Sequence, residues 1–446
     1  MENILLIDIG STYTKATAVE LTQAKLLGTS SALTTSVFDV NEGINIAVSK
    51  LEQKTGVKKF HKRFMCSSAA GGLKMVVCGL VPELTAKAAS LASMGAGAKI
   101  TGLFSYELTG DDIGKISENP PDILLLTGGT DGGNKKVILN NAKMLASVKN
   151  ELSIIIAGNR TVKAEVLEIL KNHNLFACEN VMPRLDTLNI EPAKKMIRDI
   201  FLDRIVRAKG LNDEVLMPTP AAVLAASELL AKNIGDLIVI DVGGATTDVY
   251  SIADGAPQNP GTLVKGLPEP KNKRTVEGDI GMRFSARGII DAVGINKISE
   301  ISELAENEIE QIVDSFKNNE KMLPETHNHK MLDFALAATA IETGISRHAG
   351  VMEEAYLSSG RVLIQTGKDL SNIQNIVMTG GVLINSNKAY ELTKYALFNE
   401  TEPLSLRPKQ STFYFDTNYI AAAMGLLGTY APDVAGVILN QNIRKI

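Results

Sequence analysis

LLIDIGSTYTK, at residues 5–15, is the stretch that decides the fold, and it recurs as IVIDVGGATTD at residues 238–248. In each copy, an apolar run typical of a buried strand leads to an aspartate, a glycine and small hydroxyl residues. Glycine lets backbone N–H groups approach phosphate oxygens closely, and hydroxyl groups add further donors. Mg²⁺ keeps much of its water and takes one or two carboxylates. The two copies together predict a clamp for a magnesium-bound polyphosphate.

The order of elements around the first copy disfavours the P-loop fold of many NTPases. The first copy predicts a strand at 4–7, a turn, and a returning strand at 15–20. A P-loop would instead join a strand to a helix through GxxxxGK[ST], and that motif is absent. We therefore expect a strand–turn–strand phosphate site rather than a P-loop.

Composition restricts the class of protein. The chain has 446 residues, 45% hydrophobic and 22% charged, with a net charge of −4, which is typical of a globular protein and favours neither nucleic acid nor an anionic membrane. No apolar run is long enough to span a bilayer, and the N-terminus lacks the features of a signal peptide. The three cysteines, at 66, 78 and 178, have no CxxC spacing, which disfavours a zinc ribbon or a cysteine-ligated cluster within one chain. We expect a cytoplasmic protein.

A second pair of similar stretches suggests duplication. LLLTGGT at 124–130 matches IVMTGGV at 376–382, and both pairs occur in the same order. Spacings of roughly 230 and 250 residues suggest duplicated domains rather than a solenoid. We predict two α/β lobes with nucleotide in the cleft between them. The expected boundaries are 1–232 for the first lobe, with an inserted subdomain at about 35–115, 233–410 for the second, and 411–446 for a C-terminal helix and tail returning to the interface.

Several local predictions accompany this architecture. Apolar spacing predicts helices at 42–53, 82–94 and about 418–430, and a basic amphipathic helix at 191–209. The basic face of the helix at 191–209 is expected to be solvated, with docking of an acidic partner as the alternative. Residues 267–274 are predicted to form a basic, proline-rich loop, and residues 432–446 a short tail.

These motifs resemble those of the actin, sugar-kinase and heat-shock-chaperone ATPase superfamily. Residues 8–15 resemble its first phosphate motif, 241–248 its second and 379–382 its adenosine motif. Residues 218–226 and 421–425 resemble its two connecting helices. The five motifs occur in the expected order over nearly the whole chain. The resemblance implies ribonuclease-H-like lobes around a central nucleotide cleft.

The same resemblance implies a role for each matching residue. Asp8 and Asp241 would hold Mg²⁺ through water, and Asp248 would help to position metal or attacking water. ATP or ADP is the implied nucleotide, and Thr246 joins these three aspartates as a catalytic residue. The implied contacts with phosphate and adenosine are made by Gly10, Ser11, Thr12, Tyr13, Lys15, Gly243, Gly244, Ala245, Thr246, Gly380, Gly381 and Val382.

One position departs from the superfamily pattern. In the heat-shock branch a glutamate precedes the proline of the first connecting helix and helps to position water, whereas this chain has Met217 there. A methionine can neither accept a proton nor orient water. We therefore expect slow hydrolysis, unless another group serves.

A closer resemblance extends from end to end of the chain. CSSAAGG at 66–72, LTGGTDGG at 126–133 and TVEGDIGMR at 275–283, together with the first phosphate motif, resemble the accessory proteins of glutamate mutase, a group called GlmL or MutL. The resemblance implies an ATP-dependent reactivating chaperone for an adenosylcobalamin-dependent mutase, with glutamate mutase subunits as partner. ATP binding and slow hydrolysis would drive exchange of damaged for intact cobalamin. The resemblance does not fix the oligomeric state, and a homodimer is one possibility.

Three alternatives stay open at this stage. A small-molecule kinase of the same superfamily needs a general base, for which Asp131, Asp186 and Asp279 are candidates. An actin-like, nucleotide-dependent scaffold would need neither a base nor a client. An ATP-driven electron donor to a dehydratase would carry an iron–sulfur cluster between subunits, which the cysteine spacing disfavours.

Overall fold

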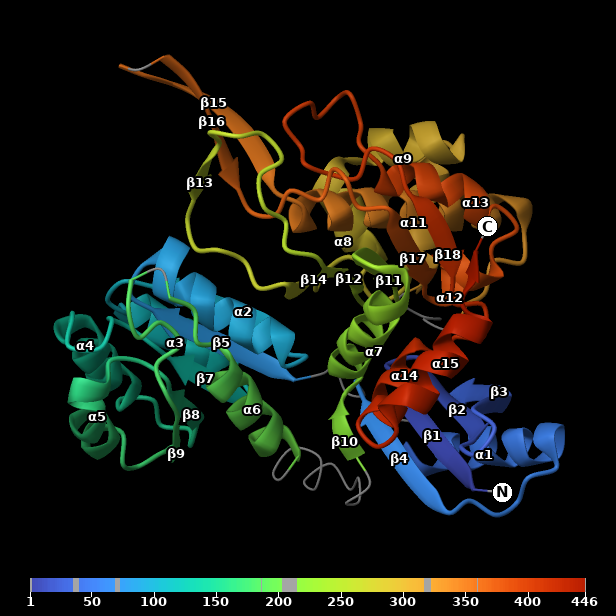
Figure 1. The fold of residues 1–446 in the computed structure, drawn as a ribbon, viewed down its shortest axis with the longest axis horizontal. Helices are drawn as coiled ribbons and strands as arrows, with labels where there is room; N and C mark the ends of the chain where they lie inside the picture. Colours follow the sequence, from blue (N-terminus) through green and yellow to red (C-terminus); the bar gives the residue numbers. More distant parts are fainter. Residues whose placement is uncertain are drawn as a thin grey trace. The chain divides into compact units, whose positions relative to one another are not determined.

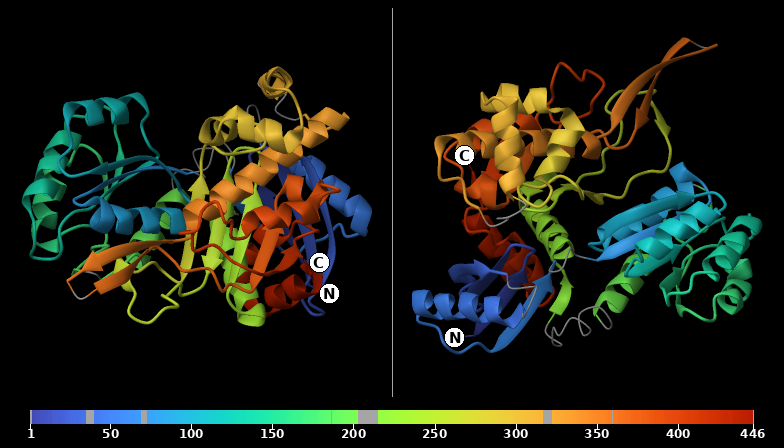
Figure 2. Two further views of the ribbon diagram at one scale, coloured as in Figure 1. Left: turned by 90° about the horizontal axis from the view of Figure 1, so that it is seen from above. Right: turned by 180° about the vertical axis from the view of Figure 1, so that it is seen from behind.

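The computed structural model describes residues 2–34, 40–68, 73–185, 187–202, 215–316, 322–358 and 360–445. The chain divides into two compact units. Unit 1 comprises Met1–Ala70, Ala222–Lys265 and Lys271–Ile446, and unit 2 comprises Gly71–Ala221 and Gly266–Pro270. Figures 1 and 2 show the ribbon of both units, which are described separately below.

The first sheet of unit 1 is built around β1. Within this unit its strands are in the order β4-β1-β2-β3, with β1 antiparallel to β2 and parallel to β4. Residues Ile4 to Ile9 of β1 are all buried, as expected for a central strand with apolar side chains on both faces. Helix α1 packs against β2 and β3. The bounds are β1 Asn3–Ile9, β2 Tyr13–Glu20, β3 Lys25–Leu33, α1 Val40–Thr55 and β4 Lys62–Ser67.

The second sheet of unit 1 repeats this pattern around β11. Its strands are in the order β14-β12-β11-β17-β18-β19, with β11 antiparallel to β12 and parallel to β17. The prediction of an α/β fold with duplicated lobes is confirmed, because both sheets place a central strand between an antiparallel and a parallel neighbour. The bounds are β11 Leu237–Val242, β12 Thr247–Ile252, β14 Asn272–Glu277, β17 Asn375–Thr379, β18 Thr412–Phe415 and β19 Arg444–Lys445.

The remaining elements of unit 1 cover the second sheet or extend from it. Helix α11 packs against β11, β12 and β14, and its many alanines allow a close approach. Strands β15 and β16 form a hairpin that extends away from the second sheet (Figure 1, orange) and pairs with β13. The bounds are α7 Thr219–Ile234, β13 Leu263–Lys265, α8 Ala286–Val293, α9 Ile295–Ser302, α10 Glu306–Phe316, α11 His327–His348, β15 Val351–Leu357, β16 Gly360–Thr366, α12 Gly381–Asn385, α13 Ala389–Leu392, η5 Thr393–Ala396, α14 Ala421–Gly428 and α15 Pro432–Asn442.

Unit 2 contains a sheet of its own, in which all strands are parallel. The strand order is β6-β5-β7-β8-β9, an open doubly wound arrangement. Most of its helices follow a parallel strand, as parallel connections require. The bounds are β5 Lys74–Gly79, η2 Pro82–Ala86, α2 Lys87–Gly95, β6 Lys99–Ser105, α3 Gly110–Glu118, β7 Ile123–Leu126, α4 Lys136–Leu145, β8 Ser153–Ile156, η3 Arg160–Val162, α5 Lys163–Ile169, β9 Asn174–Ala177, α6 Glu191–Ile200 and β10 Val215–Pro218.

The similar stretches at 124–130 and 376–382 do not contain equivalent strands. Strand β7, which begins the TGGT stretch, lies in the sheet of unit 2, whereas β17 lies in the second sheet of unit 1. The counterpart of β17 is β4, because each runs parallel to the central strand of its sheet. A buried parallel strand followed by a tight glycine turn is a general pattern, so this sequence similarity does not identify equivalent strands.

Two local predictions were wrong and one lies partly outside the described residues. The predicted basic loop ends in strand β14, where Lys273 and Arg274 are buried, because both side chains find partners inside unit 1. The predicted tail contains α15, which starts at Pro432, a favoured first helical position. Helix α6 covers Glu191–Ile200, and residues 203–209 of the predicted basic helix lie outside the described residues. In the described parts of the chain, no helix has the length and apolarity of a membrane span.

Candidate nucleotide site

The two phosphate-type turns have the same backbone geometry. The N–H of Gly10 donates to the carbonyl of Tyr13 at 3.0 Å, and the N–H of Gly243 donates to the carbonyl of Thr246 at 2.9 Å. A Cβ on Gly10 would lie 2.7 Å from the carbonyl oxygen of Tyr13, so this turn requires glycine. The aspartate before each turn is the Cα partner of the residue seven positions later, which is Lys15 in the first copy and Asp248 in the second.

The two turns approach each other within unit 1. A Cβ on Gly244 would lie 2.9 Å from Oγ1 of Thr12. The charge of Lys15 acts on both Asp8 and Asp241. The structure therefore brings together the two predicted halves of the clamp, which are about 230 residues apart in sequence.

The carboxylate of Asp8 has a partner at each of its two oxygens. Nζ of Lys15 donates to Oδ2 of Asp8 at 2.9 Å, and Sγ of Cys66 donates to Oδ1 at 3.6 Å. Burial disfavours the charged lysine, but the Asp8 carboxylate, with Tyr419 and Asp241, outweighs that cost and holds the pKa of Lys15 above its ordinary value. Lys15 is therefore a stable cation in the middle of the acidic cluster.

Asp241, unlike Asp8, has an oxygen without a partner and a disfavoured negative charge. Its Oδ1 is buried and has no hydrogen-bond partner within the described residues. Burial and the nearby charges of Asp248, Asp8 and Asp416, opposed by Lys15, raise the pKa of Asp241 to about 7. A divalent cation beside this oxygen would relieve both the repulsion and the missing contact.

The donor set fits magnesium held through water. In the described ranges, no group of three or more His, Cys, Asp or Glu side chains is arranged to ligate a metal. Mg²⁺ needs only one or two carboxylates and retains several waters. Asp8 and Asp241 supply two carboxylates, and the unpartnered oxygen of Asp241 is where a hydrated ion would find an acceptor.

Asp248 is anchored by an arginine that the sequence did not single out as a site residue. Oδ1 of Asp248 accepts from Nε of Arg274 at 2.8 Å and lies 2.6 Å from its Nη2, and Oδ2 accepts from Oγ1 of Thr246 at 3.0 Å. The Arg274 side chain is only 3% exposed, so this ion pair is shielded from solvent. The arrangement ties Thr246 and the second turn to β14. The sequence had placed Arg274 in a loop, although it directly precedes the strand-like pair Thr275–Val276.

The adenosine-type turn has two glycines with different surroundings. Gly380 has φ of +110°, and a Cβ there would lie 2.4 Å from the carbonyl oxygen of Val242. Gly381 has no atom within 4 Å of its added Cβ. Val382 packs against the hydrophobic core of the second lobe. Gly380 is thus needed for packing of the turn on β11, whereas Gly381 leaves open space where a ligand can approach the backbone.

This difference predicts opposite behaviour of two alanine variants. Gly380→Ala should destabilise the protein by about 1–3 kcal/mol, because the methyl group meets a backbone carbonyl and φ is positive. Gly381→Ala should leave unfolding unchanged and weaken binding of ATP. Thermal unfolding and equilibrium titration with Mg·ATP measure the two effects, and equal melting temperatures for the two variants would contradict the assignment.

The C-terminal segment supplies two further residues of the site. Asp416 is fully buried after β18 and accepts from the N–H groups of Ile420 and Ala421, both at 2.9 Å. Oγ1 of Thr379 donates to its Oδ2 at 3.3 Å. The ring centroid of Tyr419 lies 3.5 Å from Nζ of Lys15. Asp416 stands five residues before the alanines at 421–423, and Ile420 is the N-cap of α14, so no helix-capping pattern in the sequence identified it.

The two predicted connecting helices lie directly against each other in unit 1. A Cβ on Gly425 of α14 would lie 1.7 Å from the carbonyl oxygen of Ala222 in α7. Helix α14 also packs against β1 and β4 of the first sheet. The absence of a side chain at residue 425 therefore sets how closely these helices cross.

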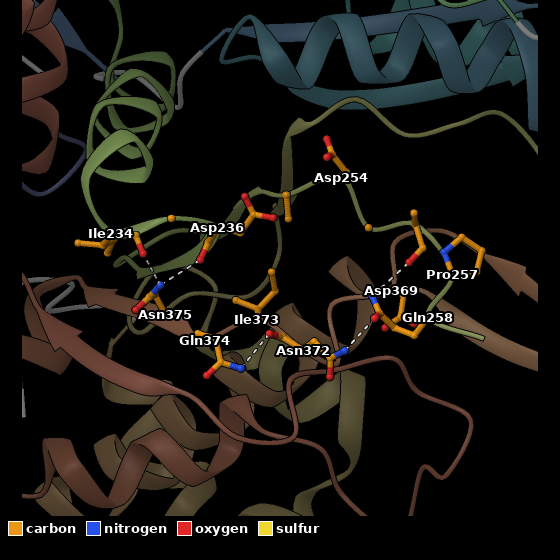
Figure 3. A pocket seen from close by; sticks show the side chains of 14 residues that line it. Ile234, Asp236, Asp254, Pro257, Gln258, Asp369, Asn372, Ile373, Gln374 and Asn375 are labelled. Carbon is orange, nitrogen blue, oxygen red and sulfur yellow. Dashed lines mark hydrogen bonds between the residues drawn. The ribbon is translucent and has the colours of Figure 1, made fainter. Parts of the chain in front are cut away.

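A separate cavity lies at the opposite end of the central strands of the second sheet. It has a volume of about 410 Å³ and lies where β11 and β17 begin, whereas Asp241 lies near the end of β11. Figure 3 shows its polar lining, in which the side-chain amide of Asn375 donates to the carbonyl groups of Ile234 and Asp236. The predicted site residues do not line this cavity.

Comparison with known proteins gives one family over the whole chain. The family model described as MutL protein matches residues 4–443. Protein MutL of Clostridium tetanomorphum is 45% identical over 464 aligned residues that cover 100% of both chains. Among solved structures, the activator of the 2-hydroxyisocaproyl-CoA dehydratase from Clostridium difficile, with bound ADPNP, is 10% identical with a TM-score of 0.32 and covers 98% of this chain and 97% of that one. Gluconate kinase from Lactobacillus acidophilus is 12% identical with a TM-score of 0.35, covering 100% and 92%.

Proposed function

The chain belongs to the MutL protein family, and from this premise we propose that it is an ATP-dependent reactivating chaperone for an adenosylcobalamin-dependent mutase, with glutamate mutase as its client. ATP binding is supported chiefly by one observation. Two turns of the same geometry, each preceded by an aspartate, lie close together near Lys15. The client is inferred from the resemblance to glutamate mutase accessory proteins.

Different residues would contact the metal, the phosphates and the adenosine of Mg·ATP. Asp8 and Asp241 hold hydrated Mg²⁺, which would neutralise phosphate charge. The N–H groups of Gly10 and Gly243 donate within their own turns, so the neighbouring N–H groups at 11–12 and 244–245 would face the phosphates, and Lys15 adds a fixed positive charge. The open face at Gly381 receives the adenosine.

Slow hydrolysis is supported by two features, one in the second turn and one in the sequence. Asp248 is ion-paired with buried Arg274, so its carboxylate is already committed to positioning the second turn. Met217, in the place of the heat-shock glutamate, is an apolar side chain and is buried. A site with strong phosphate contacts and a weak means of activating water suits a switch better than a metabolic kinase.

Asp131, one candidate base of the kinase alternative, holds a loop together. Oδ1 of Asp131 accepts from Nδ2 of Asn180 and from the backbone N–H of Arg160, both at 3.0 Å, inside unit 2. These bonds hold the loop between β7 and α4. Asp186 lies outside the described residues.

The proposal is tested by reactivation. Glutamate mutase inactivated with tightly bound cyanocobalamin is incubated with the full chain, Mg·ATP and fresh adenosylcobalamin, and both mutase activity and ATP consumption are followed. Asp8→Asn should lower ATP turnover by about 10²–10³-fold and abolish recovery, because it removes a carboxylate from the magnesium site. Asp236→Asn, an exposed change at the far end of β11, is the matched control.

The outcomes separate the two parts of the proposal. Normal turnover by folded Asp8→Asn would refute the nucleotide site. ATP consumption without recovery of the mutase would leave the ATPase in place and exclude glutamate mutase as the client.

A further inference from the structure

The backbone of Tyr419 is strained. Its φ is +52°, in the left-handed region, which costs roughly 1–2 kcal/mol for a residue with a Cβ. Its N–H donates to the carbonyl of Asp416 at 2.9 Å. The carboxylate of Asp416 accepts from the N–H groups of the next two residues, Ile420 and Ala421. These bonds fix the turn between β18 and α14, where glycine or asparagine would fit with less strain.

The side chain of Tyr419 offsets this strain by its contact with Lys15. The ammonium of Lys15 lies 3.5 Å from the ring centroid and 2.9 Å from Oδ2 of Asp8, and its side chain is 17% exposed. An ammonium over an aromatic face is attracted by the ring quadrupole, more strongly where water is excluded.

We propose that Tyr419 is a positioning residue that holds the Lys15 ammonium in the candidate nucleotide site, ready for the phosphates of Mg·ATP. The inference rests on the proposed ATP binding and adds a residue outside the five superfamily motifs. Lys15 belongs to the first sheet, and Tyr419 to the connection that leaves the second sheet for α14. The position of the lysine therefore depends on this connection as well as on Asp8.

Binding measurements test the role with variants that suit the backbone. Tyr419→Asn and Tyr419→Gly both tolerate positive φ and remove the ring, whereas Tyr419→Phe keeps it. The first two should weaken binding of Mg·ATP by about tenfold, the range of a desolvated cation–π contact, and leave binding of adenosine unchanged. Tyr419→Phe should stay within about twofold of the parent protein.

A second lysine–tyrosine pair provides the control. Nζ of Lys62 lies 3.9 Å from the ring centroid of Tyr430, and the Tyr430 side chain is half exposed. Tyr430→Leu should change neither affinity. Equal loss of Mg·ATP and adenosine binding in Tyr419→Asn would show a merely structural role and overturn the proposal.

Chemical labelling gives a readout that needs no nucleotide. The full nucleotide-free chain is treated with an amine-acetylating reagent, and modification of Lys15 is followed by peptide mass spectrometry. Lys15 should react several-fold faster in Tyr419→Asn and Tyr419→Gly than in the parent protein, Tyr419→Phe or Tyr430→Leu. Unchanged labelling would overturn the proposal. Failure of the parent protein to bind Mg·ATP would instead refute the proposed function, and the labelling would still decide whether Tyr419 holds Lys15.

Discussion

Replacing Asp241 with asparagine is expected to stabilise the metal-free protein while abolishing Mg·ATP turnover. Oδ1 of this carboxylate is buried and lacks a partner within the described residues, and the nearby charges of Asp248, Asp8 and Asp416, opposed by Lys15, disfavour its ionised form. Asparagine keeps the shape and removes the charge. The same change removes a carboxylate from the proposed magnesium site, so stability and activity should move in opposite directions.

The gain in stability should depend on pH with a defined sign. The pKa of Asp241 is about 7 in the folded protein and 3.8 ordinarily. Well below pH 3.8 the carboxyl is protonated in both states, so its ionisation makes no difference between the two proteins. Between pH 4 and 7 the unfolded chain loses this proton first, and the parent protein loses stability that the variant keeps. Above pH 7 the difference should level off at up to about 4 kcal/mol.

Thermal unfolding in EDTA from pH 4 to 8 measures this difference. Asp236→Asn, an exposed change directly before the same strand, should change stability by less than about 0.5 kcal/mol at every pH. If Asp241→Asn melted no higher than the parent protein at pH 8, the carboxylate would have a stabilising partner that contradicts this description of the site.

Gly425→Ala is expected to be the most disruptive single-methyl change in the connecting helices. The added Cβ would lie 1.7 Å from the carbonyl oxygen of Ala222 and 2.7 Å from its carbon, so α7 and α14 must move apart. Overpacking of this kind costs about 1–3 kcal/mol or more. Because α14 also packs against β1 and β4, the displacement should reach the strand that carries Asp8 and weaken Mg·ATP binding as well.

A second helical glycine makes the comparison specific. Gly436 in α15 has only Nδ2 of Asn233 near its added Cβ, at 3.7 Å, an ordinary contact. Gly436→Ala should therefore gain up to about 1 kcal/mol from helix propensity. Urea unfolding and Mg·ATP titration of both variants test the pair. A Gly425→Ala protein as stable as the parent would mean that the helices do not cross this closely.

The sequence predicted the parts of the site that depend on local pattern. An apolar strand ending in Asp-x-Gly defines its own turn, so Asp8, Gly10, Asp241 and Gly243 could be found by comparing one stretch with the other. Their meeting around Lys15 followed from the duplication. The roles assigned to these residues in binding and catalysis remain predictions.

Residues that join the site through tertiary pairing could not be found in this way. Arg274 reaches Asp248 because β14 pairs with β12, and Tyr419 reaches Lys15 from the other end of the chain. No periodic pattern in the sequence indicates either contact. The sheet of unit 2 was missed for a related reason, since the strand at 123–126 looks like any other buried parallel strand until its neighbours are known.

The discontinuity of unit 1 has a consequence for biosynthesis. Strands β1 to β4 are translated first, but α14, which packs on β1 and β4, follows some 350 residues later, a delay of roughly 20–70 s at ordinary elongation rates. During this time the continuous segment of unit 2 has left the ribosome and can complete its own parallel sheet. The N-terminal sheet, although synthesised first, must wait with one face uncovered and is among the last parts of the molecule to be completed. A nascent chain of this protein should therefore need protection for its earliest strands rather than its latest ones.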